Sequence, residues 1–282
     1  MNQIVKKKRL NDSVTLMEIL APPVARKARP GQFVILRIDE KGERIPLTVA
    51  DYDRECGTIT IIFQKVGAST YRLDTLDEGD VLLDFVGPLG TPSDLAGKEG
   101  KKIAVIGGGL GIAIAYPQAK ALHQLRADVD IIVGFRFSSL FILMDELKDA
   151  CNNLYVITDD GSNGHKGFVT KVLDEQLKAG VKYDEVIAIG PLSMMKSVCS
   201  ITKEYDIPTI VSMNSIMIDG TGMCGGCRLT VGGETKFACV DGPDFDGHLV
   251  DFEEAISRSR MYRKEEAESM ERHNCLLTGG LR

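Results

Sequence analysis

The chain has 282 residues, of which 44% are apolar and 26% are charged, and its formal net charge is -6 at pH 7. This apolar content excludes an intrinsically disordered chain, and the net negative charge argues against nucleic acid as a partner. No apolar run reaches the ~18 residues of a membrane-spanning helix, and the amino terminus has no apolar signal core. We therefore expect a cytoplasmic protein, and the length suggests roughly two domains or more.

Residues 1–97 are predicted to form an antiparallel β barrel. Alternating or β-branched runs recur at short spacing between Pro, Gly and Asp turns: SVTLMEIL, GQFVILRID, PLTVADYD, GTITIIFQKV and DVLLDFVG. A brief helix is predicted at STYRLDTL, before the last of these strands. The segment TPSDLAGKEGK is the predicted linker to the next domain.

Residues 98–215 are predicted to form a doubly wound, five-stranded parallel sheet. Short apolar strands alternate there with helical stretches, and the strands are KKIAVIGGG, DVDIIVGF, NLYVIT, EVIAIG and PTIVSM. Residues 216–250 are irregular and rich in Gly and Asp, so we expect a small separate domain. Residues 251–282 are predicted to form one long, largely polar helix followed by a tail.

A glycine-rich turn stands where the first strand of the parallel sheet becomes a helix. In IAVIGGGLGIAIA, glycines let backbone N–H groups approach a pyrophosphate at the helix amino terminus. Ile112 occupies the place of the third glycine in the G-x-G-x-x-G pattern, so a tight turn without a ligand remains an alternative. The candidate residues are Gly107, Gly108, Gly109, Gly111 and Ile112.

Two further strand ends of the parallel sheet carry polar or glycine-rich loops. Ligands of open α/β sheets bind at the carboxyl ends of the strands, where these loops lie. The end of the second strand has Arg136 instead of the acidic residue that binds the NAD ribose, which leaves NAD and NADP open. The candidate residues in the two loops are Thr158, Asp160, Gly161, Gly190 and Pro191.

In the barrel, GERIPLTVAD and IIFQKVGASTYRL supply a cation, hydroxyl groups and exposed amides. Such groups suit a diphosphate beside a flat ring, although an ordinary barrel turn is the alternative.

Three of the seven cysteines are clustered in IDGTGMCGGCRLT and KFACVDG, which points to metal or redox chemistry in a reducing compartment. Plant-type two-iron clusters use a C-x4-C-x2-C run and one remote cysteine. Here Asp219 stands in the first position, followed by Cys224, Cys227 and Cys239, so a carboxylate is the candidate fourth ligand. The alternatives are zinc with His248 or Asp241, Cys275 as fourth ligand, or Asp219 as a simple turn residue.

The order of PLT, GAST, GGGLG, TDDGS, GPLSMM, DGTGMCGGC and FACVDGPDFDGHLVDF resembles the ferredoxin-reductase-like electron-transfer subunits over essentially the whole chain. The resemblance is greatest to small subunits of NADH-dependent ferredoxin:NADP oxidoreductases, also described as sulfide dehydrogenase beta subunits. Electron-transfer subunits of dihydroorotate dehydrogenases are more distant.

The resemblance implies three cofactors: FAD, NAD(H) and a [2Fe-2S] cluster. Arg44 departs from the family pattern, because it lies four residues before Thr48 where the family spacing is three. The resemblance favours NADH despite Arg136, with the nicotinamide cofactor at Gly107 to Gly111, Asp160, Gly161 and Gly190. FAD would lie at Pro46, Leu47, Thr48, Ile62, Phe63 and Gln64, with its diphosphate at Ser69 and Thr70.

The resemblance also implies a reaction and a partner. A hydride would pass between nicotinamide and FAD, and single electrons would pass between FAD and the cluster. The implied partner is a larger subunit with its own flavin and [4Fe-4S] clusters, in which NADPH oxidation is bifurcated between NAD and ferredoxin. The alternatives are a dihydroorotate or sulfide/polysulfide oxidoreductase, and a non-catalytic nucleotide-binding redox sensor.

Overall fold

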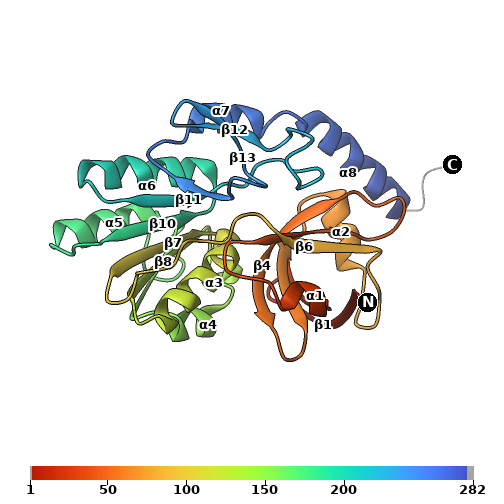
Figure 1. Ribbon diagram of the computed structural model, residues 1–282, viewed down its shortest axis with the longest axis horizontal. Coiled ribbons are helices and arrows are strands. Elements are labelled where there is room, and N and C mark those ends of the chain that lie inside the picture. Colours follow the sequence, from red (N-terminus) through yellow and green to blue (C-terminus); the bar gives the residue numbers. More distant parts are fainter. Residues whose placement is uncertain (1, 278–282) are drawn as a thin grey trace.

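Two large sheets and one small hairpin organise the computed structural model, which describes residues 2–277 (Figure 1). The first sheet is antiparallel, has six strands in the order β1-β2-β5-β4-β3-β6, and confirms the predicted barrel. Its strands are β1 (Gln3–Arg9), β2 (Val14–Leu20), β3 (Phe33–Arg37), β4 (Ile45–Asp53), β5 (Thr58–Gln64) and β6 (Asp84–Leu89). Two short helices accompany them, α1 (Pro22–Ala25) and the predicted α2 (Ala68–Asp74).

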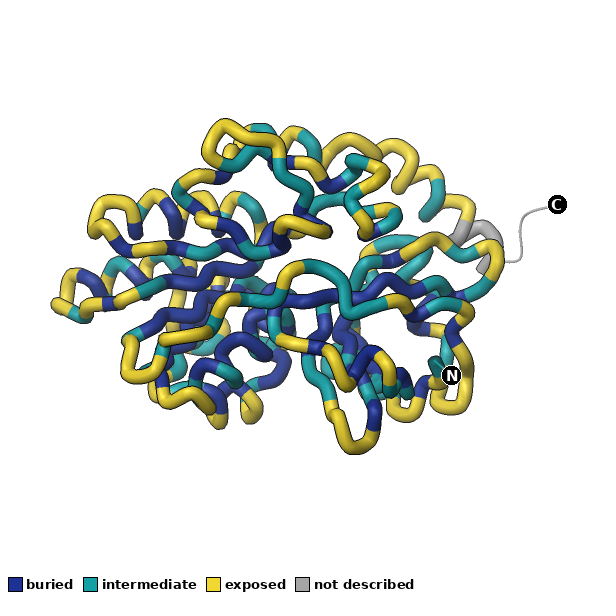
Figure 2. Tube along the Cα trace, in the orientation of Figure 1, coloured by how far each residue is buried: buried dark blue, intermediate teal, exposed yellow. Residues whose placement is uncertain are grey.

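Alternation along the strands decides which barrel residues are buried. Successive strand side chains point to opposite faces, so the branched residues of β2 and β5 fill one interior. The interior includes Met17, Ile19, Ile59, Ile61 and Phe63, all of them fully buried. Figure 2 shows this buried centre beneath exposed turns.

The second sheet has six strands in the order β14-β11-β10-β7-β8-β9. Five of them are parallel and confirm the predicted doubly wound sheet: β7 (Lys102–Gly108), β8 (Asp128–Phe135), β9 (Asn153–Thr158), β10 (Glu185–Ile189) and β11 (Thr209–Ser212). Its helices are α3 (Gly111–Gln124), η1 (Ser138–Leu140), α4 (Met144–Asp149), α5 (Val169–Lys178) and α6 (Leu192–Glu204).

The sixth strand, β14 (Asp244–Asp246), was not predicted. It pairs antiparallel with β11 and comes from the Gly- and Asp-rich segment that follows the sheet in sequence. Three residues of the sequence Asp-Phe-Asp are too short to show a strand period. The strand joins the irregular segment to the edge of the parallel sheet.

The carboxyl-terminal region consists of a hairpin and two helices. The hairpin is β12 (Arg228–Val231) with β13 (Glu234–Phe237). The expectation of one long helix was wrong, because α7 (Phe252–Arg258) ends before α8 (Arg263–Leu277) begins. The N–H groups of Arg260 and Met261 bond to carbonyls three residues back, so the α-helical ladder stops there. The helix α8 then continues over the barrel beside α2 (Figure 1).

The three regions share one apolar core. Phe33 of the barrel, Ile106 of the parallel sheet and Phe252 of α7 belong to the same buried cluster, together with Cys227 and Cys239. Burial of a common apolar surface holds the regions in a fixed relation. Among the described helices, none combines the length and the apolarity that crossing a bilayer requires.

A buried carboxyl group lies where the three regions meet. Asp244 of β14 accepts hydrogen bonds at Oδ2 from Ser93 Oγ at 2.6 Å and from Gln118 Nε2 at 3.2 Å. The other carboxyl oxygen, Oδ1, is buried without a hydrogen-bond partner among the described residues. Burial raises the pKa of Asp244 above its ordinary value, although the hydrogen bonds partly oppose that shift.

We expect Asp244→Asn to change how stability depends on pH. The raised pKa means that the folded protein keeps a proton on Asp244 that the unfolded chain has already released, so the free energy of unfolding falls as pH rises. Asparagine cannot ionise, so unfolding free energies measured in urea from pH 4.5 to 7.5 should favour the variant increasingly, by up to about 1.4 kcal/mol per pH unit. A difference in unfolding free energy between the two proteins that does not change with pH would contradict the raised pKa of Asp244.

Candidate functional site

The glycine-rich turn lies at the switch point of the parallel sheet. The chain runs from β7 through β8 to β9 on one side and returns through β10 to β11 on the other, so β7 and β10 are neighbours. Gly108 ends β7, and a Cβ atom built on Gly190, just after β10, would lie 3.1 Å from the Gly108 nitrogen. The structure therefore brings the GGGLG and GPLS loops together, at the place where open α/β sheets bind ligands.

The start of α3 is packed against the backbone of the neighbouring loop. A Cβ atom on Gly111 would lie 2.8 Å from the Cα atom of Gly190, which leaves no room for a side chain. Ile112 is fully buried, and a Cβ atom on Gly107 would lie 3.0 Å from its Cα atom. Ile112 is thus a core residue beneath the turn, while Gly109, at a φ of +54°, faces open space.

The TDDGS loop lies two strands away from the switch point, after β9. Thr158 is buried and its hydroxyl bonds to Asn163 Oδ1 at 2.9 Å, so it shapes the loop and is not free for a ligand. The Asp160 N–H donates to the Arg136 carbonyl at 3.3 Å, which joins this loop to the end of β8. The N–H of Ser162 bonds to the Asp160 carboxylate at 2.9 Å and lowers the pKa of that carboxyl. Arg136 is exposed beside it at the rim.

One face of the barrel offers the expected flavin residues. Pro46, Leu47 and Thr48 of β4 are half-buried and pair with β3. On β5, Gln64 is half-buried and Ile62 joins the apolar cluster of the parallel sheet. The side chain of Phe63 points the other way, into the barrel interior, as strand alternation requires. Only the backbone of Phe63 is therefore left to face a flavin on this side of β5, and its role as a FAD-binding residue stays a prediction.

The helix α2 uses its hydroxyl groups locally. Thr70 Oγ1 accepts from the N–H groups of Val66 at 3.0 Å and Gly67 at 3.1 Å, so it holds the turn before the helix. The Ser69 hydroxyl donates to the Glu43 carboxylate, and Arg44 is exposed. Neither hydroxyl is therefore free for a diphosphate without rearrangement.

A groove of about 610 Å³ runs between the β3–β4 connection, α2 and α8, a volume within the range of cofactor sites. Sequence reasoning missed two arginines that line it. Arg72 stands one helical turn after Ser69 and forms an ion pair with Asp39. Arg272 comes from α8, two hundred positions later, so no local spacing linked it to the barrel. Other lining residues are Ile38, Lys41, Ile45, Ala68, Thr75 and Ser269.

The cysteine loop is wound by glycines. Gly220, Gly222 and Gly225 have φ values of +73°, +82° and +68°, a region that side chains other than glycine rarely adopt. Cys224 is exposed at the tip, and its sulfur accepts the N–H of Gly226 at 3.4 Å. One backbone amide thus points at a candidate ligand sulfur.

The other two cysteines lie at the base of the loop. Cys227 and Cys239 are buried and adjacent. Burial raises the pKa of the Cys239 thiol to about 12, and the neighbouring Cys227 and the charge of Asp219 add to the shift. A cation bound at this place would reverse that shift, because thiolates are the metal-binding form.

Asp219 lies on the same loop as Cys224 and Cys227. Its Oδ1 accepts the N–H of Thr221 at 2.8 Å, and that bond is the main cause that lowers the pKa of Asp219. A hydrogen bond with Cys224 adds to the effect. Within residues 2–272, whose side chains the structure describes, no three His, Cys, Asp or Glu side chains form a ready-made metal cage. The donor set itself, three thiols and one carboxylate beside backbone amides, fits a two-iron cluster.

The rival ligands have other roles. His248 Nε2 lies 3.0 Å from the Thr202 hydroxyl, against α6. The Asp241 carboxylate accepts the Phe237 N–H at 2.7 Å and closes the β13 turn. Because His248 and Asp241 are already engaged in these contacts, Asp219 is favoured over them as the fourth ligand. The side chain of Cys275 lies outside the described residues.

Comparison with known sequences gives the family. The profile of the iron-sulfur cluster binding domain of dihydroorotate dehydrogenase B matches residues 214–251. A Thermotoga maritima protein named as a dihydroorotate dehydrogenase B (NAD(+)) electron transfer subunit homolog is 45% identical over 96% of this chain and 95% of its own. The electron transfer subunit of Clostridium perfringens is 32% identical over 80% of this chain and 88% of its own.

Comparison with solved structures agrees. A structure reported for flavin-based electron bifurcation in the NADH-dependent reduced ferredoxin-NADP oxidoreductase matches with a TM-score of 0.90 and 45% identity, over 96% of this chain and 97% of that one. An Amycolatopsis cytochrome P450 reductase matches with a TM-score of 0.60 at 18% identity, over 72% of this chain and 64% of that one, which shows the fold alone. The expected resemblance is confirmed: the chain belongs to the family of dihydroorotate dehydrogenase B electron-transfer subunits and their homologues.

Proposed function

We propose that this chain is the flavin- and iron-sulfur-carrying electron-transfer subunit of an NADH-dependent ferredoxin:NADP oxidoreductase. The observation that carries the proposal is the TM-score of 0.90 at 45% identity with a structure reported for that enzyme, over nearly the whole of both chains. The donor set of one carboxylate and three thiols, in the order Asp219, Cys224, Cys227 and Cys239, supports it.

FAD, NAD(H) and a [2Fe-2S] cluster supply the redox chemistry when bound. Of the three, only the flavin exchanges both electron pairs and single electrons. The protein residues orient these groups. Gly108 and Gly190 let the two loop backbones approach each other at the switch point where the nicotinamide cofactor would bind, and Thr48 offers a hydroxyl on β4. Asp219 provides an oxygen donor, which is harder than sulfur and favours ferric iron.

The single electrons need a further acceptor or donor outside this chain. The relatives are named as electron transfer subunits, so we propose a larger partner that carries its own flavin and [4Fe-4S] clusters and exchanges electrons with ferredoxin. Exposure of Cys224 at the loop tip supports transfer to a docked protein. We further propose a cytoplasmic location, where thiols remain reduced.

Anaerobic purification of the tagged chain from its own cells tests this proposal. We expect a larger flavin- and [4Fe-4S]-containing chain to co-purify, and the complex to reduce ferredoxin and NAD together when NADPH is oxidised. A complex that instead oxidises dihydroorotate with NAD would favour the second candidate, which the names of the relatives support. A chain that isolates alone and binds NADH without passing electrons to an artificial acceptor would be a redox sensor, and the proposal would fail.

A further inference from the structure

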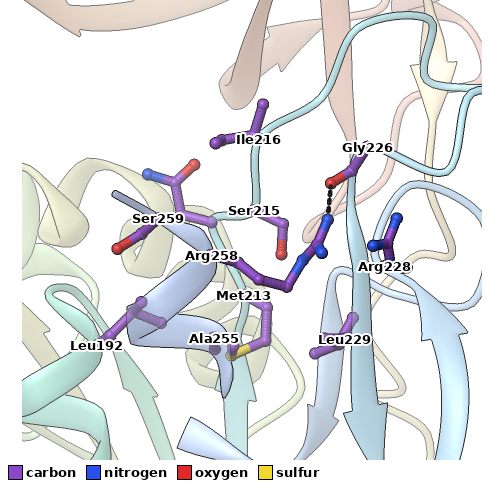
Figure 3. A pocket seen from close by; sticks show the side chains of 11 residues that line it. Leu192, Met213, Ser215, Ile216, Gly226, Arg228, Leu229, Ala255, Arg258 and Ser259 are labelled. Carbon is purple, nitrogen blue, oxygen red and sulfur yellow. Dashed lines mark hydrogen bonds between the residues drawn. The ribbon is translucent and has the colours of Figure 1, made fainter. Parts of the chain in front are cut away.

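An arginine of α7 contacts the cysteine loop from outside. Arg258 is half-buried, and its Nη2 donates to the carbonyl oxygen of Gly226 at 3.1 Å, as the dashed line in Figure 3 marks. Gly226 lies between Cys224 and Cys227 in the sequence. A guanidinium group bonded to a carbonyl makes a charge-assisted hydrogen bond, which is stronger than a neutral one.

The helix that carries Arg258 is itself fixed. Phe252 and Ala255 bury one side of α7 in the shared core. The Asp251 side chain caps the helix by accepting the N–H of Glu254 at 3.0 Å. The Glu254 carboxylate, one turn before Arg258, accepts the N–H of Thr230 at 3.0 Å and so ties α7 to β12. The guanidinium is therefore presented from a rigid support.

The contact constrains two amides of the loop. The Gly226–Cys227 peptide is trans, so its N–H points away from the carbonyl that Arg258 holds. The N–H of Gly226 itself donates to the Cys224 sulfur. By fixing the carbonyl, Arg258 sets the direction of the Cys227 N–H directly, and it limits the rotation of the neighbouring peptide that carries the Gly226 N–H.

The charge of Arg258 is not neutralised by an ion pair with any side chain that the structure describes. Glu253, which lies on the same helix as Arg258, pairs instead with Lys196 of α6. A positive charge held near a redox centre stabilises the reduced, more negative form. Arg228 lines the same small hollow but has an exposed side chain (Figure 3). Only Arg258 of the two bonds to the loop backbone among the described contacts.

We propose that Arg258 is a positioning residue for the [2Fe-2S] cluster, which fixes the cysteine loop through Gly226 and raises the reduction potential of the cluster. The inference rests on the proposed function, because it requires the cluster at Asp219 and the three cysteines. It adds a residue outside the ligand motif, more than thirty positions after Asp219, Cys224 and Cys227 in the sequence.

The test compares Arg258→Met and Arg258→Lys with Arg260→Met in the full chain, purified anaerobically with its partner. Arg260 is an exposed arginine two positions later, and its removal changes the net charge equally. Redox titration followed by electron paramagnetic resonance measures the midpoint potential of the cluster. We expect Arg258→Met to make reduction about tenfold less favourable, a shift of about 59 mV to lower potential.

Arg258→Lys keeps the charge and should recover most of that shift, whereas Arg260→Met should match the parent. Equal potentials and identical spectra for Arg258→Met and Arg260→Met, at full cluster content, would overturn the proposal. Loss of the cluster from Arg258→Met with retention in Arg258→Lys would support it. Loss of the cluster from both Arg258 variants would support it if their circular dichroism matches the parent and overturn it if they are unfolded. A parent protein without a two-iron signal would instead overturn the proposed function.

Discussion

Replacing Asp219 by alanine is expected to lower the amount of two-iron cluster that the protein retains by at least about tenfold. The substitution removes an anionic oxygen donor, and loss even of an outer partner of a metal site costs 10- to 100-fold in affinity by typical order of magnitude. Iron and sulfide content per chain after anaerobic purification measures the loss. The loop should still fold, because its winding depends on Gly220, Gly222 and Gly225.

Two further variants make this result specific. Asp219→Cys restores four thiolates and should keep the cluster, at a higher reduction potential, because sulfur stabilises ferric iron less than oxygen does. Asp241→Asn removes a carboxylate from the same region while keeping an acceptor for the Phe237 N–H, and should keep the cluster unchanged. Parental iron content and an unaltered resonance spectrum in Asp219→Ala would show that Asp219 is only a turn residue.

Gly111→Ala should raise the dissociation constant for NADH by at least about tenfold. The added methyl group would press on the backbone of Ile189 and Gly190, which cannot rotate away as a side chain can. The start of α3 must then move, and small displacements of a binding group weaken binding by one to two orders of magnitude. Quenching of protein-bound flavin or isothermal titration with NADH measures the effect.

Gly67→Ala is the matched control for that experiment. Gly67 precedes α2 as Gly111 opens α3, but a Cβ atom there meets nothing within 4 Å. The control should bind NADH as the parent does. Equal NADH affinity in Gly111→Ala and the parent would show that close backbone packing at the switch point does not position the nicotinamide cofactor.

The hydrophobic patterns of the sequence were sufficient to predict both large sheets, because strands such as β5 and β7 carry long β-branched runs bounded by turn residues. They were insufficient for β14, whose pairing depends on the edge of β11 and not on its own three residues. The break between α7 and α8 was also hidden, since no Gly or Pro marks it and Arg260 and Met261 are good helix formers. The domain boundaries at residues 97, 215 and 250 stay predictions.

The site was predictable where glycine spacing or cysteine spacing is local. The structure brings Gly108 beside Gly190, as the strand ends suggested, and places Cys239 beside Cys227 across the β12–β13 hairpin. Arg272 and Arg258 could not be found this way, because each comes from a helix far along the chain and acts through tertiary contact. The roles of the individual cofactor-binding residues remain predictions.

Anaerobic reduction by NADH shows whether electrons pass from nicotinamide through flavin to iron in this chain. The purified chain is titrated with NADH while visible absorbance follows the flavin and electron paramagnetic resonance follows the iron. We expect bleaching of bound flavin together with the signal of a reduced two-iron cluster that integrates to the iron content. A colourless protein that contains zinc, or flavin reduction with no signal from iron, would contradict it.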